Sequence, residues 1–239
     1  MLVFALALGS VAVQIDVGLF ASVSILTLHP GRALLLNQRL SKPATILRGS
    51  LPRDVPCESA TPRNACSLTH LRALRALRGR SGWHLILEDD AIESGWVAQT
   101  PDWAERVFAS AGPEALMINF GPGAFRPSVS QVMSRPIESA YGWIKTRLFA
   151  RSGFTVLHGM GSYAHAYAIR EPAVELITSA LEQSLCSITA IDLHYNSLTE
   201  HWVKQVHLHQ FTPEWLGVTV NQSRAGLFSQ SLHISDVPY

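Results

Sequence analysis

A short apolar run that ends in three acidic residues is the feature that most constrains this fold. Residues 83–92 read WHLILEDDAI, so the apolar run at 85–87 is followed directly by Glu88, Asp89 and Asp90. A run of this kind between polar segments is typical of a buried strand, which would carry the acids to an edge of a sheet. Adjacent carboxylates repel one another unless a cation lies between them or one carboxylate keeps its proton. The sequence therefore predicts a buried strand that presents clustered carboxylates.

Two interpretations of these acids stay open on the residues alone. A hard divalent ion such as Mn²⁺ or Mg²⁺ would relieve the repulsion and could bridge a diphosphate. The other interpretation is a solvated acidic turn, or the cap of a helix that starts near Ala91.

Strand and helix patterns alternate along the chain. Strand patterns lie at 22–28, 46–47, 83–87 and 115–120, helix patterns at 32–40, 65–77, 103–111 and 174–185, and short strands are expected in 206–233. Such alternation is typical of an α/β fold with a mostly parallel sheet covered by helices on both faces. Residues 124–154 show no clear periodicity, and we expect a flexible or acceptor-facing insertion there.

Composition limits the classes of partner. The chain has 239 residues, a 47% hydrophobic content and a net charge of +1, which suit a folded domain and give no indication of a nucleic-acid partner. Residues 2–13 are apolar and uncharged, a length that suits a signal-peptide core better than a membrane span. We therefore expect a signal-like or clipped targeting segment at 1–20 and a single domain at 21–239, with a buried strand near the start as the alternative. Peripheral membrane association stays open.

The cysteines and one row of arginines allow further alternatives. Cys57 and Cys66 could pair in an oxidising compartment, or the three cysteines, including Cys186, could all keep their thiols. On the helix expected at 65–77, arginines at 72, 75 and 78 share a face that could meet phosphate, although a solvated face is the more common use.

Several segments together resemble a family of glycosyltransferases, the lipopolysaccharide glycosyltransferases and collagen galactosyltransferases grouped as family 25. The segments are ILTLHPGR at 25–32, ACSLTH at 65–70, LILEDDAI at 85–92, MINFG at 117–121, GSYAHAYAI at 161–169, AIDLHYNSL at 190–198, PEWLGVTVNQS at 213–223 and FSQSLHIS at 228–235. Their order covers nearly all of the chain after residue 20. The chain departs from the family at 27–30, where Thr-Leu-His-Pro replaces a turn that contains asparagine and aspartate.

The resemblance implies a GT-A-type fold that binds a nucleotide sugar on a Rossmann-like sheet. In this family an acidic motif after a strand holds Mn²⁺ (or Mg²⁺) against the diphosphate of a UDP-sugar donor. Glu88, Asp89 and Asp90 match that motif, which implies Glu88 and Asp90 as metal ligands and Glu88 and Asp89 as donor-binding residues.

Further donor-binding residues are implied by two other segments. Thr69 and His70 match the end of the family's cysteine to serine-histidine segment, and Arg32 matches a basic position after the first strand. On the residues alone, a helix histidine is often structural and an arginine near a turn is often a surface charge.

Acceptor binding and catalysis are assigned to the second half of the chain. Tyr163, His165 and Tyr167 alternate, so in a strand they would share one face, which suits either sugar binding or sheet packing. Asp192 matches the family's downstream aspartate, and we expect it to deprotonate the acceptor hydroxyl. Asp89 and Glu138 are weaker candidates for that base, and a helix N-cap is the other use of Asp192. His207 and His209 could add a metal ligand, but they are left outside the expected metal site.

The resemblance therefore implies an inverting, metal-dependent transferase. It would move a hexose, galactose from UDP-galactose being the first choice, to a glycan, lipopolysaccharide or glycoprotein acceptor. The alternative is a non-catalytic glycan-binding or assembly protein that retains the fold. A metal phosphohydrolase has less support, because the sequence shows no second distributed set of metal ligands.

Overall fold

The computed structural model describes residues 14–121, 154–158, 165–187, 191, 203–208 and 228–230. The insertion expected at 124–154 lies outside these ranges except for its last residue. The elements, in chain order, are β1 Ser22–Thr27, α1 Pro30–Gln38, β2 Thr45–Arg48, the short 3₁₀ helix η1 Pro52–Asp54, α2 Pro62–Arg75, β3 His84–Glu88, β4 Ala91–Glu93, α3 Gly95–Gln99, α4 Trp103–Ala111, β5 Met117–Asn119, β6 Phe154–His158, β7 Ala166–Ile169, α7 Ala173–Ser184, β8 Val203–Leu208 and β9 Phe228–Gln230.

Seven of the described strands form one sheet in the order β2-β1-β3-β7-β5-β8-β6. β1 runs parallel to β2 and β3, and β5 runs parallel to β8, whereas β7 lies antiparallel between β3 and β5 and β6 is antiparallel to β8. Five of the seven strands therefore point the same way, and the expected mostly parallel α/β sheet is confirmed. A second, two-stranded sheet joins β4 and β9 in antiparallel pairing.

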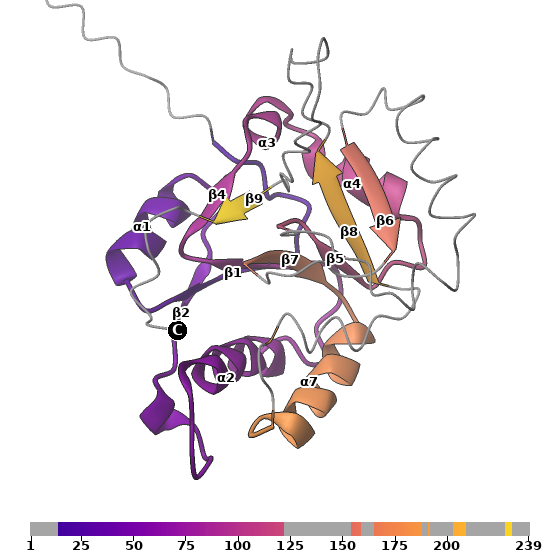
Figure 1. Ribbon diagram of the computed structural model, residues 1–239. Coiled ribbons are helices and arrows are strands. Elements are labelled where there is room, and N and C mark those ends of the chain that lie inside the picture. Colours follow the sequence, from indigo (N-terminus) through magenta and orange to yellow (C-terminus); the bar gives the residue numbers. More distant parts are fainter. Residues whose placement is uncertain are drawn as a thin grey trace, which may run out of the picture.

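Helices cover both faces of the large sheet (Figure 1), as expected for a doubly wound arrangement. On one face, buried residues of α1 and α4 pack with the odd-numbered residues of β3, Leu85 and Leu87. On the other face, α2 and α7 pack over Ile86 and Tyr167. Since successive side chains of a strand point to opposite faces, Glu88 continues the row of Ile86 toward α2.

Local sequence signals explain where α2 begins and what it buries. The Thr61 hydroxyl accepts a hydrogen bond from the Asn64 amide at 3.3 Å, and the Thr61 amide donates to Asn64 Oδ1 at 2.9 Å. The two residues thus form a capping box at the first turn of α2, which also contains Pro62. The leucines at 68, 71, 74 and 77 are buried, as their helical spacing predicts.

The arginine row lies on the solvated side of α2 and the turn after it. Arg75 bonds Glu182 of α7 at 2.8 Å, and Arg78 pairs with both Glu175 and Glu182. Arg72 donates to Ser50 Oγ at 2.9 Å. The more common interpretation of these arginines is therefore confirmed, and two of them tie α2 to α7.

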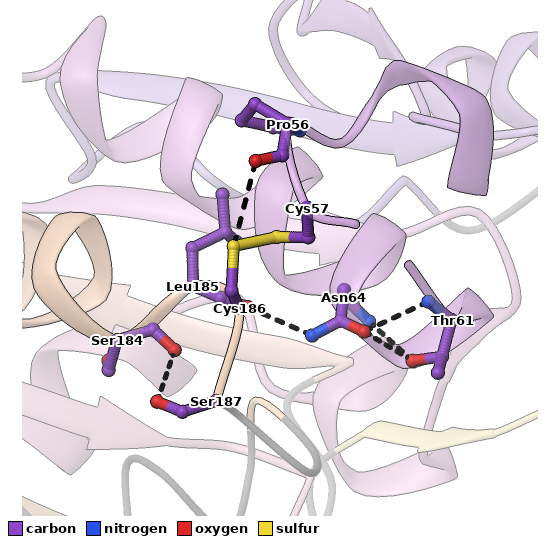
Figure 2. The surroundings of a disulfide bond; sticks show 8 residues. All are labelled: Pro56, Cys57, Thr61, Asn64, Ser184, Leu185, Cys186 and Ser187. Carbon is purple, nitrogen blue, oxygen red and sulfur yellow. Dashed lines mark hydrogen bonds between the residues drawn. A yellow bond between two sulfur atoms is a disulfide. The ribbon is translucent and has the colours of Figure 1, made fainter. Parts of the chain in front are cut away.

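A disulfide joins Cys57 to Cys186, with their Cα atoms 5.5 Å apart and a sequence separation of 129 positions. Figure 2 shows it between the loop after η1 and the end of α7. Both alternatives considered from the sequence, the pairing of Cys57 with Cys66 and free thiols at all three cysteines, are wrong. The packing of α2 against α7 brings the two distant segments together, whereas Cys66 lies on α2 and stays outside the disulfide.

The folded part of the chain extends upstream of residue 21. Ile15, Val17 and Phe20 are buried in the core beneath α1 and α4, and Ile15 forms a parallel bridge with Leu40. The targeting segment expected at 1–20 stays a prediction for residues 1–13, which lie outside the described ranges. Among the described helices, none is both long and apolar enough to cross a bilayer.

Candidate functional site

The three acids lie where β3 ends. Glu88 is the last residue of β3, Asp89 and Asp90 form a turn, and β4 begins at Ala91. The acids do not cap a helix near Ala91, one of the alternatives considered from the sequence, because the strand β4 follows the turn. All three carboxylate residues are partly buried, so they do not form an open, solvated acidic loop.

Asp89 is bound to the end of the neighbouring strand β1. Its amide donates to the Leu26 carbonyl at 3.0 Å. The Thr27 hydroxyl donates to Asp89 Oδ2, and the His29 amide approaches the same oxygen at 3.3 Å and Thr27 Oγ1 at 2.7 Å. The segment that departs from the family pattern thus supplies the donors that orient Asp89.

Glu88 faces α2 and contacts a buried histidine there. His70 Nε2 lies 3.1 Å from Glu88 Oε1, and His70 Nδ1 lies 3.0 Å from the Tyr167 hydroxyl. The His70 and Tyr167 rings stack at 22° with centroids 5.8 Å apart. With its Nε2 proton donated to Glu88, His70 accepts from the Tyr167 hydroxyl at Nδ1, so one chain of hydrogen bonds links β7, α2 and β3.

The charge of Glu88 follows from these neighbours. Burial acts to raise the pKa of the Glu88 carboxyl, but the hydrogen bond from His70 and electrostatic interactions with the His70 and His165 rings outweigh it and lower the pKa below its usual value. Glu88 is therefore ionised at neutral pH. About a quarter of its side chain, 26%, is exposed to solvent.

Two further residues, Thr69 and Arg32, are expected to bind the donor. Thr69 is buried on α2, where its hydroxyl accepts from the Ser50 amide at 2.8 Å and donates to the Ala65 carbonyl at 2.9 Å. Arg32 lies in the first turn of α1, and its amide donates to the His29 carbonyl at 2.9 Å. The structure thus places Arg32 near the loop that orients Asp89, while the Thr69 hydroxyl is engaged within the fold.

Two of the three expected acceptor-binding residues are described, and both are buried. Tyr167 is 0% exposed and takes part in the contact with His70. The His165 carbonyl accepts from the Glu88 amide at 2.8 Å, and the imidazole of His165 packs against Gly121. The face that His165 and Tyr167 were expected to share is therefore turned toward Glu88 and the core. Tyr163 lies outside the described residues.

The residues expected to act in catalysis lie mostly beyond what is described. Asp192 and Glu138 fall outside the described ranges, although Ile191, the neighbour of Asp192, is buried with the residues of α2 and α7. His207 lies in β8, where it pairs with Thr155, and His209 is outside the described residues.

The sequence did not identify Thr27 and His29, which orient Asp89. It also did not identify Cys66 as a possible ligand; Cys66 takes no part in orienting the acids but lies one turn before His70, with its sulfur near the His70 and Glu88 ligand atoms. The spacing of Cys66 and His70, four residues apart on a helix, was the available signal for that ligand.

No family model matches this chain, and no curated protein matches it. One solved structure with a likeness is a crystal structure described as a glycosyltransferase involved in the glycosylation of the major capsid of PBCV-1. That likeness has a TM-score of 0.36 and 11% identity and covers 70% of this chain and 69% of the other, which is too distant to carry an argument about fold or activity.

Proposed function

We propose that this chain is an inverting, metal-dependent glycosyltransferase that moves a hexose from a UDP-sugar to a glycan, lipopolysaccharide or glycoprotein acceptor. The family 25 resemblance supplies this expectation, with UDP-galactose as the first donor to test. The observation that supports it is the set of three partly buried carboxylates at the shared end of β1 and β3. Ligands of α/β folds commonly bind beyond the carboxyl ends of the strands.

The donor atoms of this set fit a hard divalent ion. Glu88 and Asp90 offer carboxylate oxygens, the ligands that Mn²⁺ and Mg²⁺ prefer, and the lowered pKa of Glu88 keeps it charged. When bound, such an ion would offset the negative charge that develops on a departing diphosphate.

The chain's own residues would then have separate tasks. His70 holds the Glu88 carboxylate, and Thr27 and the His29 amide hold that of Asp89, so the acids are oriented before a ligand arrives. Asp192 would accept the proton of the acceptor hydroxyl at a carboxylate oxygen. Inversion at the anomeric carbon requires the base to lie on the side of the sugar opposite the leaving group.

The decisive experiment is a screen of UDP-sugars for Mn²⁺-dependent hydrolysis, together with calorimetric titration of UDP with and without the metal. Asp90→Ala should abolish metal-dependent UDP binding, whereas Asp102→Asn, which removes a carboxylate from the exposed start of α4, should leave it unchanged. Equal UDP affinity in Asp90→Ala and the unsubstituted protein would contradict the proposal.

A second variant tests the base. Asp192→Asn should retain UDP binding and lose sugar transfer to the best acceptor from a glycan array. Near-normal turnover in that variant would move the base to another carboxylate. If UDP binds but no donor is hydrolysed or transferred, the non-catalytic glycan-binding alternative replaces the transferase.

A further inference from the structure

A cysteine, a histidine and a glutamate converge where α2 meets the end of β3. Cys66 and His70 lie four residues apart on α2 and therefore on the same side of the helix. Glu88 reaches them from β3, and one ligand atom from each of the three lies within 4.8 Å of the others. A sulfur, a nitrogen and an oxygen donor thus surround one point.

The histidine is already oriented as a metal ligand would be. Tyr167 is fully buried and holds His70 at Nδ1, which leaves Nε2 directed at Glu88. Histidines that bind metals usually have their other ring nitrogen held by a hydrogen-bonding partner, which fixes the ring and its tautomer. If Nε2 took a metal ion, the ring proton would reside on Nδ1 and be donated to the Tyr167 hydroxyl oxygen.

The mixture of donor types determines which ion fits. Thiolate and imidazole favour zinc and similar transition metals, whereas Mg²⁺ and Mn²⁺ prefer sites made only of oxygens. Three protein ligands leave a fourth tetrahedral position for water. Cys66 is exposed and Glu88 partly so, and solvent can therefore supply that position.

We propose that Cys66 Sγ, His70 Nε2 and a Glu88 carboxylate oxygen form a binding site for a zinc-type transition metal ion. Binding replaces the hydrogen bond between His70 and Glu88 with two bonds to the ion and releases the thiol proton of Cys66 to solvent. The site is distinct from the proposed Mn²⁺ site, which uses Glu88 with Asp90 and no sulfur. Because Glu88 belongs to both sets, zinc should compete with Mn²⁺ at this edge of the sheet.

Cobalt absorption tests the site without any nucleotide. The full chain is purified without reductant so that Cys57 and Cys186 stay paired, which leaves Cys66 as the source of a thiolate ligand. Adding Co²⁺ should produce a thiolate-to-cobalt charge-transfer band with one ion bound per chain, and Zn²⁺ should displace it. Cys66→Ser should lose the band and bind Zn²⁺ at least about ten-fold more weakly.

Matched variants separate the ligands from general effects on the protein. Glu88→Gln should weaken Zn²⁺ binding, and Glu182→Gln, at an exposed carboxylate of α7, should not. Tyr167→Phe should keep the band but lower the affinity by about 10- to 100-fold, as expected for a positioning residue. At the same Zn²⁺ concentration, the Tm of the unsubstituted protein should rise more than that of Cys66→Ser.

Two results would overturn the site. One is the absence of a charge-transfer band in the unsubstituted protein, and the other is a band that persists in Cys66→Ser. Neither depends on UDP, so the failure of this site and the failure of the proposed transferase activity are distinguishable. As a further check, Cys66→Ser should bind UDP with Mn²⁺ as the unsubstituted protein does while losing inhibition of that binding by Zn²⁺.

Discussion

The side-chain amide of Asn64 donates a hydrogen bond to the Leu185 carbonyl at 2.9 Å, although 121 residues separate the two in sequence. Figure 2 shows this contact beside the disulfide, so the end of α7 is linked both to the loop before α2, through Cys57, and to the first turn of α2, through Asn64. Asn64 also completes the capping box with Thr61, and its side chain is therefore engaged both within α2 and across to α7.

Asn64→Ala should lower the free energy of unfolding more than Thr61→Ala does. The Asn64 variant leaves the buried Leu185 carbonyl without this donor, which costs about 1–3 kcal/mol, in addition to weakening the cap. Thr61→Ala removes only the cap, worth about 1 kcal/mol. Urea denaturation of the two variants measures the difference, and equal losses would show that the contact with Leu185 contributes nothing.

Removing the disulfide should destabilise the protein without changing the cluster around Glu88. Cys57→Ser combined with Cys186→Ser should lower the free energy of unfolding by about 2–5 kcal/mol, because the unfolded chain regains the freedom that the cross-link removes. Chemical denaturation with and without reductant measures it. Reduction should lower the stability of the unsubstituted protein and leave the double variant unaffected.

His70→Gln should raise the pKa of Glu88. In the unsubstituted protein burial acts to raise that pKa, and the contact with His70 reverses the effect. Without the imidazole, burial dominates. A carboxyl ¹³C titration by NMR measures the change, with Glu182 as the internal reference because its pKa is lowered by Arg75 and Arg78, which the substitution does not touch. An unchanged Glu88 titration would exclude His70 as the cause.

Acid should destabilise the protein through His84, at the start of β3. Burial lowers the pKa of the His84 imidazole below its usual value of 6.5. Above that value the contribution to stability is fully present, and it is lost as the pH falls, because the unfolded chain takes up a proton that the folded chain resists. Unfolding free energies measured between about pH 7.5 and 5.5 should fall less steeply in His84→Gln. Identical slopes would contradict this assignment.

Gly121→Ala should disturb His165. A Cβ at residue 121 would overlap the His165 ring at Nε2, and overpacking of this kind costs about 1–3 kcal/mol. Gly31→Ala is the matched control, since a Cβ there meets nothing within 4 Å and alanine favours the helix α1. Thermal unfolding should show a lower Tm for the first variant alone, and an unchanged Tm in Gly121→Ala would show that the ring can move aside.

The sequence predicts the elements of this fold better than their order in the sheet. Helix α4 was expected at the residues where it occurs, and β1 and β3 within one residue at either end, because their apolar periodicities are strong. The antiparallel insertion of β7 between β3 and β5 has no local signature, since which strand pairs with which is decided by the whole sheet. The disulfide was missed for the same reason.

The site shows the same division between local and long-range information. The carboxylates at 88–90 were singled out because three adjacent acids at the end of a buried strand repel one another unless a cation or a proton relieves the repulsion. The contacts around them were not predicted, since Thr27 reaches Asp89, and Tyr167 reaches His70, only through the pairing of β1 and β7 with β3. The metal, the donor sugar and the roles of the individual residues stay predictions.

The contact of Asp89 with β1 also makes the site sensitive to strand alignment. In the native register Leu26 pairs with Glu88, and Thr27, the last residue of β1, meets Asp89 directly after the end of β3. A slip of one residue would turn every side chain of one strand to the opposite face, separating Asp89 from Thr27 or Glu88 from α2. If the proposed metal ion binds at this edge, its binding would therefore show whether β1 and β3 have paired in the correct register. A molecule with the wrong register would not bind the ion even if its core were compact.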